Sequence, residues 1–237
     1  MHKPLGIIFD FGDTILHLVS VDWAAGPSKL LQLANDTKGL SARDIQLVMN
    51  ELGHELFALR DNSTLEFRYD GYLRIICETL GITLNISYAE AAREIWHASM
   101  KYLPTEGIPG VLETIATMGV KMGILSNSTF SETVLREELA KHGIERWFSV
   151  IMSSADYGLM KPHHRLIELA VKRMELHRED VWFVGDRLDY DIRGALNFGL
   201  FPVWYNPTDI PIGGDYQCLG IGHWRELQDK VKSLYGQ

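Results

Sequence analysis

Short, almost wholly apolar segments recur along the chain and predict buried β-strands. The first covers residues 5–10 and ends in an acid, and similar segments follow at 120–125, 148–152, 181–184 and 200–205. A short apolar run without alternation is typical of a strand that is covered on both faces. We therefore expect these five segments to be neighbours in one central sheet.

Segments in which apolar residues recur at helical spacing lie between these strands. They cover residues 111–118, 131–142, 163–174, 191–198 and 223–234. Strands that alternate with helices of this length favour a parallel sheet with helices on both faces. The fold class predicted for this part of the chain is therefore α/β.

One stretch, from residue 17 to residue 103, breaks the alternation and predicts helices without a strand. Ser41 with Asp44 and Ser87 with Glu90 fit capping boxes, which begin helices by pairing a hydroxyl and a carboxylate with free backbone N–H groups. The three helical patterns cover 45–59, 65–80 and 87–102. We expect an inserted all-helical subdomain at 17–103 and a core made of 1–16 and 104–237. Residues 206–222, which are rich in Gly and Pro, predict a surface loop before the last helix.

Composition and charge narrow the classes of partner. The 237 residues carry a formal net charge of −8, which disfavours a nucleic-acid partner. No apolar run approaches the roughly 18 residues needed to span a bilayer, and the N-terminus lacks the pattern of a signal peptide. The two cysteines, Cys77 and Cys218, lie far apart and favour free thiols in a reducing compartment. We therefore expect a cytoplasmic protein without a membrane partner, and the sequence leaves its oligomeric state open.

Polar side chains follow four of the predicted strands. In an open parallel sheet, ligands bind outside the carboxyl ends of the strands, so these side chains are candidates for one common site. Each of them alone also fits a helix cap, a turn or a solvated charge. The candidates, in chain order, are Asp10, then Ser126 with Asn127, then Lys161, and finally Asp186 with Asp191.

Together these residues suit phosphate chemistry. Asp10 and Asp186 offer the hard oxygen ligands that Mg²⁺ prefers, and Lys161 and Ser126 offer donors to phosphate oxygens, joined by backbone N–H groups at Asn127. Asp10 is placed to attack phosphorus and form an aspartyl-phosphate that water then cleaves. The residues therefore favour a small phosphorylated metabolite as substrate.

The same residues resemble the motifs of the haloacid dehalogenase superfamily of hydrolases. The first motif matches residues 9–16, the second Ser126-Asn127, the third Lys161-Pro162, and the fourth Gly185-Asp186 with Asp191. This resemblance, which covers nearly the whole chain, implies a Rossmann-like core, a helical cap inserted after the first motif, and Mg²⁺. It also implies phosphomonoester hydrolysis as the usual activity, and it places Asp191 with the metal-binding residues.

The chain departs from that family at one position. The family phosphatases usually carry a second Asp two residues after the nucleophile, as general acid and base, where this chain has Gly12. Glycine keeps the backbone carbonyl that the family uses as a metal ligand, so the departure affects proton transfer more than metal binding. Asp13 either replaces the missing acid or serves only to fix the loop.

Three functions remain open at this stage. The leading hypothesis is a Mg²⁺-dependent phosphatase in which Asp10, Asp13 and Lys161 are catalytic. A 2-haloacid dehalogenase would use Asp10 on carbon without a metal, but it would not need Asp186 and Asp191. A binding or regulatory protein for a phosphorylated metabolite, with weak or no turnover, is the third hypothesis, because Gly12 replaces the usual acid.

Overall fold

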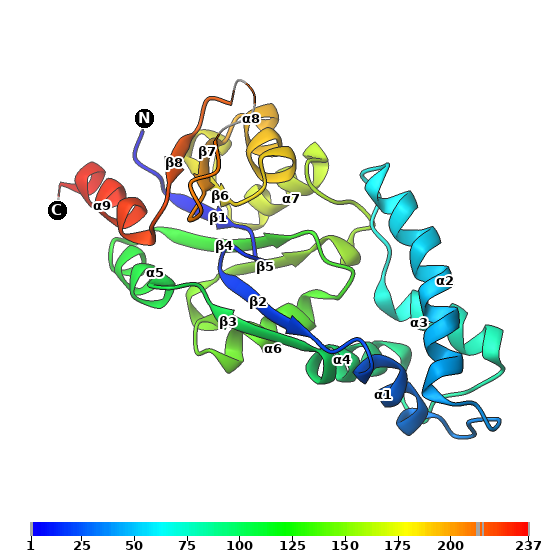
Figure 1. The fold of residues 1–237 in the computed structure, drawn as a ribbon. Coiled ribbons are helices and arrows are strands. Elements are labelled where there is room, and N and C mark those ends of the chain that lie inside the picture. Colours follow the sequence, from blue (N-terminus) through cyan, green and yellow to red (C-terminus); the bar gives the residue numbers. More distant parts are fainter. Residues whose placement is uncertain (1, 212–213, 215, 237) are drawn as a thin grey trace.

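A six-stranded parallel sheet forms the centre of the computed structural model, which describes residues 2–211, 214 and 216–236. The strand order is β5-β4-β1-β6-β7-β8, so β1 is central (Figure 1). This arrangement confirms the predicted α/β class with a Rossmann-like parallel sheet. The strands are β1 (Gly6–Phe9), β4 (Lys121–Ser126), β5 (Val150–Ser153), β6 (Val181–Gly185), β7 (Phe201–Tyr205) and β8 (Leu219–Ile221).

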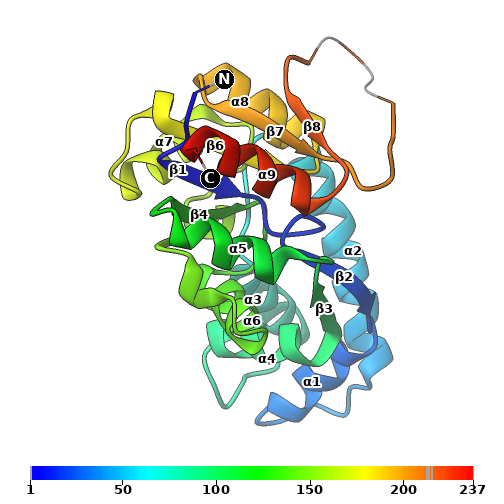
Figure 2. The ribbon, with the colours of Figure 1, turned by 90° about the vertical axis from the view of Figure 1, so that its left-hand side faces the viewer.

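Helices cover both faces of this sheet. Side chains alternate along β1, so Ile7 and Phe9 pack into one apolar cluster while Ile8 packs into another. The cluster around Ile7 contains the apolar faces of α5 (Ile108–Thr117), α6 (Glu132–Lys141) and α9 (Trp224–Tyr235). Figure 2 shows α5 and α9 side by side on that face. The opposite face is covered by α7 (His164–Arg173) and α8 (Arg193–Phe198).

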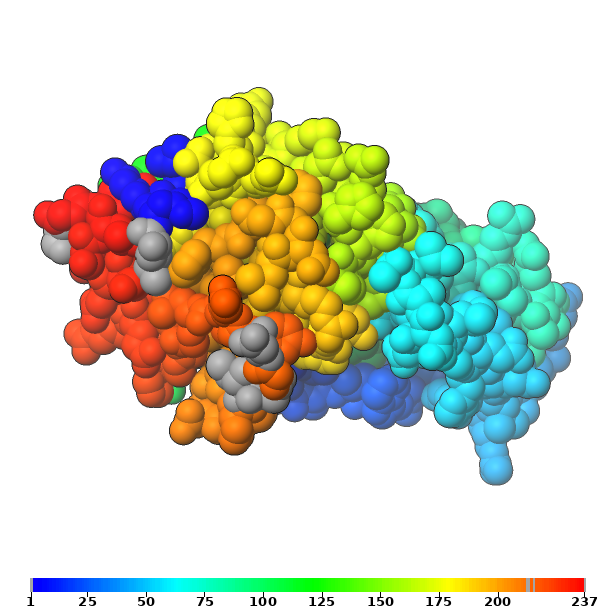
Figure 3. All heavy atoms as spheres, turned by 90° about the horizontal axis from the view of Figure 1, so that it is seen from above, coloured from blue at the N-terminus to red at the C-terminus, as the bar shows by residue number. Residues whose placement is uncertain are grey.

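The stretch between β1 and β4 contains the three expected helices and one more, α1 (Ala25–Leu33), which was not predicted. The expected ones are α2 (Ala42–Asp61), α3 (Tyr69–Leu80) and α4 (Tyr88–Ser99), and we call the four together the helical block. Both predicted capping boxes are present, since Ser41 pairs with Asp44 and Ser87 with Glu90. The block forms a lobe beside one end of the core (Figure 3).

The prediction that residues 17–103 contain no strand is wrong. Leu16–Val21 (β2) and Met100–Pro104 (β3) form an antiparallel ribbon that carries the chain into the helical block and back. One face of this ribbon is apolar and mostly half-buried while the other is exposed, so no continuous apolar run marks it, and a register shift between Leu18 and Ser20 interrupts the alternation in β2. As a result, the helix predicted over 87–102 ends at Ser99.

The prediction of a loop over residues 206–222 is also wrong near the end of this range. Leu219–Ile221 forms β8, which pairs in parallel with β7 at the edge of the sheet. A strand of three residues beside glycines is too short to show an alternating pattern. In the described part of the chain, no helix combines the length and apolar character that crossing a membrane requires.

Candidate active site

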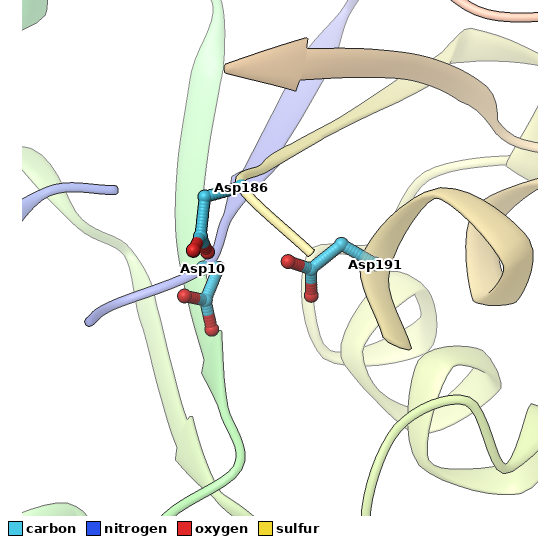
Figure 4. Close-up of side chains that lie close together, drawn as sticks. All are labelled: Asp10, Asp186 and Asp191. Carbon is cyan, nitrogen blue, oxygen red and sulfur yellow. The ribbon is translucent and has the colours of Figure 1, made fainter. Parts of the chain in front are cut away.

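Three carboxylates meet at the carboxyl ends of the two central strands. Asp10 follows β1 directly, Asp186 follows β6, and Asp191 lies in the helical turn Leu188–Ile192 behind it. Each residue offers an oxygen atom within 4.8 Å of the others (Figure 4). Because β1 and β6 are paired in register, their ends bring Asp10 and Asp186 to the same edge of the sheet. This juxtaposition is the one expected from residues that follow neighbouring parallel strands.

Burial and mutual repulsion change the acidity of two of these groups. Burial, helped by the negative charges of Asp10 and Asp191, raises the pKa of Asp186 from 3.8 to about 7. Burial also raises the pKa of Asp191 to about 6, although the Lys161 ammonium opposes the change. Carboxylates that repel one another in this way are stabilised by a cation placed among them. The donor set, which consists of oxygen atoms alone, suits a hard divalent ion.

Lys161 is the buried positive charge of the site. Its Nζ lies 2.5 Å from Asp10 Oδ1 and 2.7 Å from Asp191 Oδ1, and its side chain is 1% exposed. Burial by itself would lower the pKa of Lys161, but the two carboxylates outweigh this effect and raise it. The ammonium group is therefore charged and fixed between the two acids.

Asn127 fixes the segment that carries Lys161. Its Oδ1 accepts a hydrogen bond of 2.7 Å from the backbone N–H of Lys161, and its Nδ2 donates one of 3.0 Å to the backbone carbonyl of the same residue. Ser126, the last residue of β4, is buried and lines the cavity that also contains Asp10 and Lys161. The amide of Asn127 thus connects the loop after β4 to the lysine.

The position of Asp191 depends on a glycine at the end of β6. A Cβ atom at Gly185 would lie 2.2 Å from Asp191 Oδ2, which is far below a permitted contact. Asp191 Oδ2 also accepts a hydrogen bond of 3.0 Å from the backbone N–H of Arg187. Glycine is therefore required at 185 to let the carboxylate pack against the strand.

Gly12 and Asp13 are not members of the group of three carboxylates. A Cβ atom at Gly12 would meet no other atom within 4 Å, so the position has room for a side chain. Asp13 has a positive φ of 52°, and its carboxylate is 59% exposed and 3.0 Å from His17 Nδ1. Both residues line the cavity, but Asp13 does not belong to the group of three acids.

The carboxylates and Lys161 line a cavity of about 240 Å³ that the helical block helps to close. Arg60 from α2, Trp96 from α4 and Tyr102 from β3 contribute to its wall. A separate cavity of about 670 Å³, with a mainly apolar lining, lies between the helical block and the loop at Thr129, and it contains none of the predicted site residues. The chemistry therefore belongs to the smaller cavity.

Sequence reasoning did not identify Arg60 or Tyr102 as part of the site. Both residues lie far from the motifs along the chain, and no spacing relates them to Asp10. Thr14 lies within the first motif, and its hydroxyl donates a hydrogen bond of 3.3 Å to Asp186 Oδ1, a contact that the motif alone does not predict. A basic residue at the end of a predicted helix was the one available signal for Arg60.

Comparison with known proteins identifies one family of hydrolases. A profile of the haloacid dehalogenase-like hydrolases matches residues 7–204. A glyceraldehyde 3-phosphate phosphatase of Methanocaldococcus jannaschii is 33% identical over 52% of this chain and 54% of its own length. Another, from Pyrococcus furiosus, is 28% identical over 86% of this chain and 82% of its own. The matched segment thus spans about half of the first relative and most of the second.

Dehalogenases also resemble the chain. The (S)-2-haloacid dehalogenase of Pseudomonas sp. strain YL is 29% identical over 57% of this chain and 56% of its own length. The crystal structure of a 2-haloacid dehalogenase from Pseudomonas syringae pv. Tomato matches 99% of this chain and 100% of its own with a TM-score of 0.69 and 18% identity. At this identity the structural match concerns the fold.

Proposed function

The chain belongs to the haloacid dehalogenase-like hydrolases, and we propose that it is a Mg²⁺-dependent phosphatase that acts on a small phosphorylated metabolite. The observation that carries the proposal is the grouping of Asp10, Asp186 and Asp191 around buried Lys161. The glyceraldehyde 3-phosphate phosphatases among its relatives support the same reaction class.

The acidic cluster fits a divalent cation. Two of its pKa values are raised because negative charge is crowded and buried there, and a cation would relieve this crowding. Asp10, Asp186 and Asp191 would hold the ion, together with the backbone carbonyl of Gly12. When bound, Mg²⁺ would neutralise charge on the phosphoryl group during its transfer.

Asp10 is the proposed nucleophile. Its carboxylate oxygen forms a bond to phosphorus while the bond from phosphorus to the ester oxygen breaks, which leaves an aspartyl-phosphate and an alcohol. Water then attacks phosphorus, releases inorganic phosphate and restores the carboxylate. Lys161, Ser126 and the N–H groups at Asn127 hold the phosphoryl oxygens through charge-assisted hydrogen bonds.

The departing ester oxygen needs a proton, and Gly12 cannot supply one. Asp13 is the nearest acid in sequence, but its carboxylate lies against His17. We propose that Asp13 delivers this proton after the loop adjusts. If it does not, the leaving oxygen takes its proton from water. Turnover is then slower by about 10²–10⁴-fold, which is the usual contribution of general acid catalysis.

Dehalogenation is a second candidate because an (S)-2-haloacid dehalogenase matches 57% of the chain. The acidic cluster favours the phosphatase, since attack on carbon without a metal needs neither Asp186 nor Asp191.

We also propose that residues 17–103 serve as a cap that covers the substrate, because Arg60 and Trp96 of this segment line the cavity.

A paired assay tests the proposed function. The protein is incubated with a panel of small phosphate monoesters and with 2-chloropropionate, with Mg²⁺ or with excess chelator, and the release of phosphate and of chloride is measured. We expect phosphate release that requires Mg²⁺ and disappears in Asp10→Asn. Chloride release in chelator would establish the dehalogenase instead, and ester binding without any turnover would establish the binding protein.

A further inference from the structure

Arg60 brings a positive charge from the helical block into the cleft. It is the second-last residue of α2, its side chain is 17% exposed, and it lines the same cavity as Asp10. Its Nη2 lies 3.5 Å from the backbone carbonyl of Asn127, in the loop that follows β4. The guanidinium group is therefore beside the loop that we assign to phosphate binding.

A buried acid holds this arginine in place. Glu66 Oε1 accepts from Arg60 Nε at 2.7 Å and Glu66 Oε2 accepts from Nη2 at 2.9 Å, so the pair is bidentate. The Glu66 side chain has no exposed surface. Paired hydrogen bonds of this kind fix the plane of the guanidinium group as well as its position.

Glu66 is attached to the core. The Ser154 hydroxyl donates to Glu66 Oε2 at 2.7 Å and accepts from the backbone N–H of Ser128 at 2.8 Å. The backbone N–H of Glu66 donates to the carbonyl of Gly158 at 3.1 Å. Arg60 is thus oriented by groups that also shape the loop after β4.

The contacts of Arg60 leave part of its guanidinium group available. Its hydrogen bonds to described residues use Nε and Nη2, while Nη1 takes part in none of them. Lys161, in contrast, directs two of its three N–H donors at carboxylates. Arg187 also lines the cavity, but it pairs with Asp189, and both side chains are about half exposed. Arg60 is therefore the better oriented of the two arginines.

The proposed reaction relates Arg60 to the leaving group. In phosphoryl transfer the attacking and leaving oxygens lie roughly in line on opposite sides of phosphorus. With Asp10 as nucleophile at the end of the sheet, the leaving group would extend away from the sheet, toward the helical block whose residue Arg60 lines the same cavity. The Nη1 of Arg60 has two N–H groups that can donate charge-assisted hydrogen bonds to a carboxylate there.

We propose that Arg60 determines specificity by binding a carboxylate on the leaving group of the phosphate ester, with Glu66 as its positioning residue. The inference rests on the proposed function and names its substrate class as the phosphate ester of a compact hydroxy acid. The cavity of about 240 Å³ has room for such a compact ester.

A binding experiment tests this inference without depending on turnover. Asp10→Asn provides a parent protein that lacks the nucleophile, and calorimetry at a Mg²⁺ concentration that saturates this variant measures Kd for 3-phosphoglycerate and for glycerol 3-phosphate. The first of these ligands has a carboxylate where the second has a hydroxymethyl group. Arg60→Met with Glu66→Gln removes both charges together, because Glu66 alone would remain as an unpaired buried charge.

We expect the parent to bind 3-phosphoglycerate more tightly, and the double change to weaken that ligand by about tenfold or more while glycerol 3-phosphate changes less than about twofold. Arg60→Lys keeps the charge but loses the planar pair of donors, and should weaken 3-phosphoglycerate selectively as well. Arg74→Met, at an exposed arginine of α3 paired with Glu78, is the control for general loss of charge.

Equal losses for the two ligands, or a parent without preference, would overturn the inference. If neither ligand binds the parent, the inference fails as well. Absence of phosphate release from every ester by the wild-type protein would refute the proposed function but leave the difference in Kd measurable. Turnover of small esters with no effect of Arg60 on their ranking would refute the inference alone.

Discussion

Single residues of the cluster depend on one another for their charge. Lys161 remains protonated because Asp10 and Asp191 flank it, and the pKa of Asp186 is raised because burial and the same two acids disfavour another negative charge. Removing one member therefore changes the others. Such crowding of titratable groups in a cleft is typical of functional sites.

Asp186→Asn tests the cation at this scale. The change removes one carboxylate ligand while keeping the size of the side chain, and Mg²⁺ exchanges its water ligands reluctantly. We expect Mg²⁺ binding, measured by calorimetry, to weaken by at least about tenfold and Mg²⁺-dependent phosphate release to disappear. Full activity of the wild-type protein in excess chelator would contradict the role of the metal.

The raised pKa of Asp186 predicts a pH dependence of stability. In the metal-free protein Asp186 holds its proton up to about pH 7, whereas the unfolded chain releases it near 3.8, so this group costs stability as pH rises between these values. Mg²⁺ competes with that proton and binds more tightly as pH rises. We expect the increase in Tm caused by Mg²⁺ to be larger near pH 8 than near pH 5.5.

Differential scanning fluorimetry at matched Mg²⁺ concentrations measures this increase. Asp186→Asn, which cannot titrate, is the control and should show a smaller increase with a weaker pH dependence. An increase in Tm that is the same at both pH values in the wild-type protein would show that the cation does not bind at the titrating carboxylates.

Gly12→Asp tests whether proton transfer limits the rate. The open space around a Cβ atom at this position allows the substitution without a clash, and the backbone of Gly12 is outside the left-handed region that would disfavour it. A rise in kcat of up to about 10²-fold would show that the general acid is missing and would contradict the role proposed for Asp13. If Asp13 already transfers the proton, Asp13→Asn lowers kcat steeply and Gly12→Asp adds little.

Steady-state kinetics of phosphate release distinguishes these cases. Wild-type turnover that is fast and unchanged in Asp13→Asn would remove Asp13 from the mechanism. The contact of Asp13 with exposed His17 could also fix the loop, in which case Asp13→Asn lowers Tm without changing kcat.

At the scale of secondary-structure elements, the helical block is attached to the core at several places. The β2–β3 ribbon carries the chain in both directions, and the segment before α3 pairs with the core where Met160 donates to the Thr64 carbonyl at 2.9 Å. On α4, the Trp96 indole donates to buried Glu138 of α6 at 2.8 Å. A movement of the whole helical block about the β2–β3 ribbon would break these contacts. We therefore expect α3 and α4 to stay with the core.

α2 is the least anchored helix of the block. Among its twenty residues, Ile45, Met49 and Gly53 are the buried ones, and it packs on α1 and α3 rather than on the sheet. Few buried contacts favour local opening. We expect backbone amides of α2 to exchange with deuterated solvent at least about tenfold faster than those of α4, measured by mass spectrometry.

Ligand binding gives the control for this prediction. Because Arg60 lies at the end of α2, a phosphorylated acid bound with Mg²⁺ should slow exchange in α2 more than in α4. Equal protection of the two helices in the free protein would show that the block is rigid as a whole and that α2 does not open separately.

The elements that could be predicted from the sequence are marked by local patterns of residues. Strands buried on both faces leave unbroken apolar runs, and capping boxes mark helix starts, so β1, β6 and the start of α2 could be predicted. The β2–β3 ribbon has an exposed face and β8 has only three residues, and their pairing partners are decided by the tertiary fold. Local patterns carry no information on that choice.

At the scale of the whole molecule, the topology assembles the site. Asp10 and Lys161 are separated by 151 positions in the sequence, yet they meet because β1 and β4 end at the same edge of the sheet and Asn127, after β4, holds the backbone of Lys161. Residues that follow strands could therefore be predicted as one group. Arg60 could not, because its place depends on how the helical block folds back over the core through Glu66 and Ser154.

The whole chain is acidic, with a formal net charge of −8, so its overall field repels phosphorylated substrates. Binding of such an anion must depend on short-range positive charge. Lys161, the proposed cation and Arg60 would supply that charge within one cavity. The account thus connects substrate binding directly to the metal and to the position of the block.

The most direct measurement is the identification of a phosphoryl group on Asp10. The wild-type protein is quenched with acid during turnover of a small phosphate ester with Mg²⁺, and the peptide that contains Asp10 is examined by mass spectrometry. The account predicts that this peptide carries the mass of one phosphoryl group, and that the adduct is absent in chelator and in Asp10→Asn. Phosphate release without any adduct on that peptide, or an ester formed on Asp10 from 2-chloropropionate instead, would contradict it.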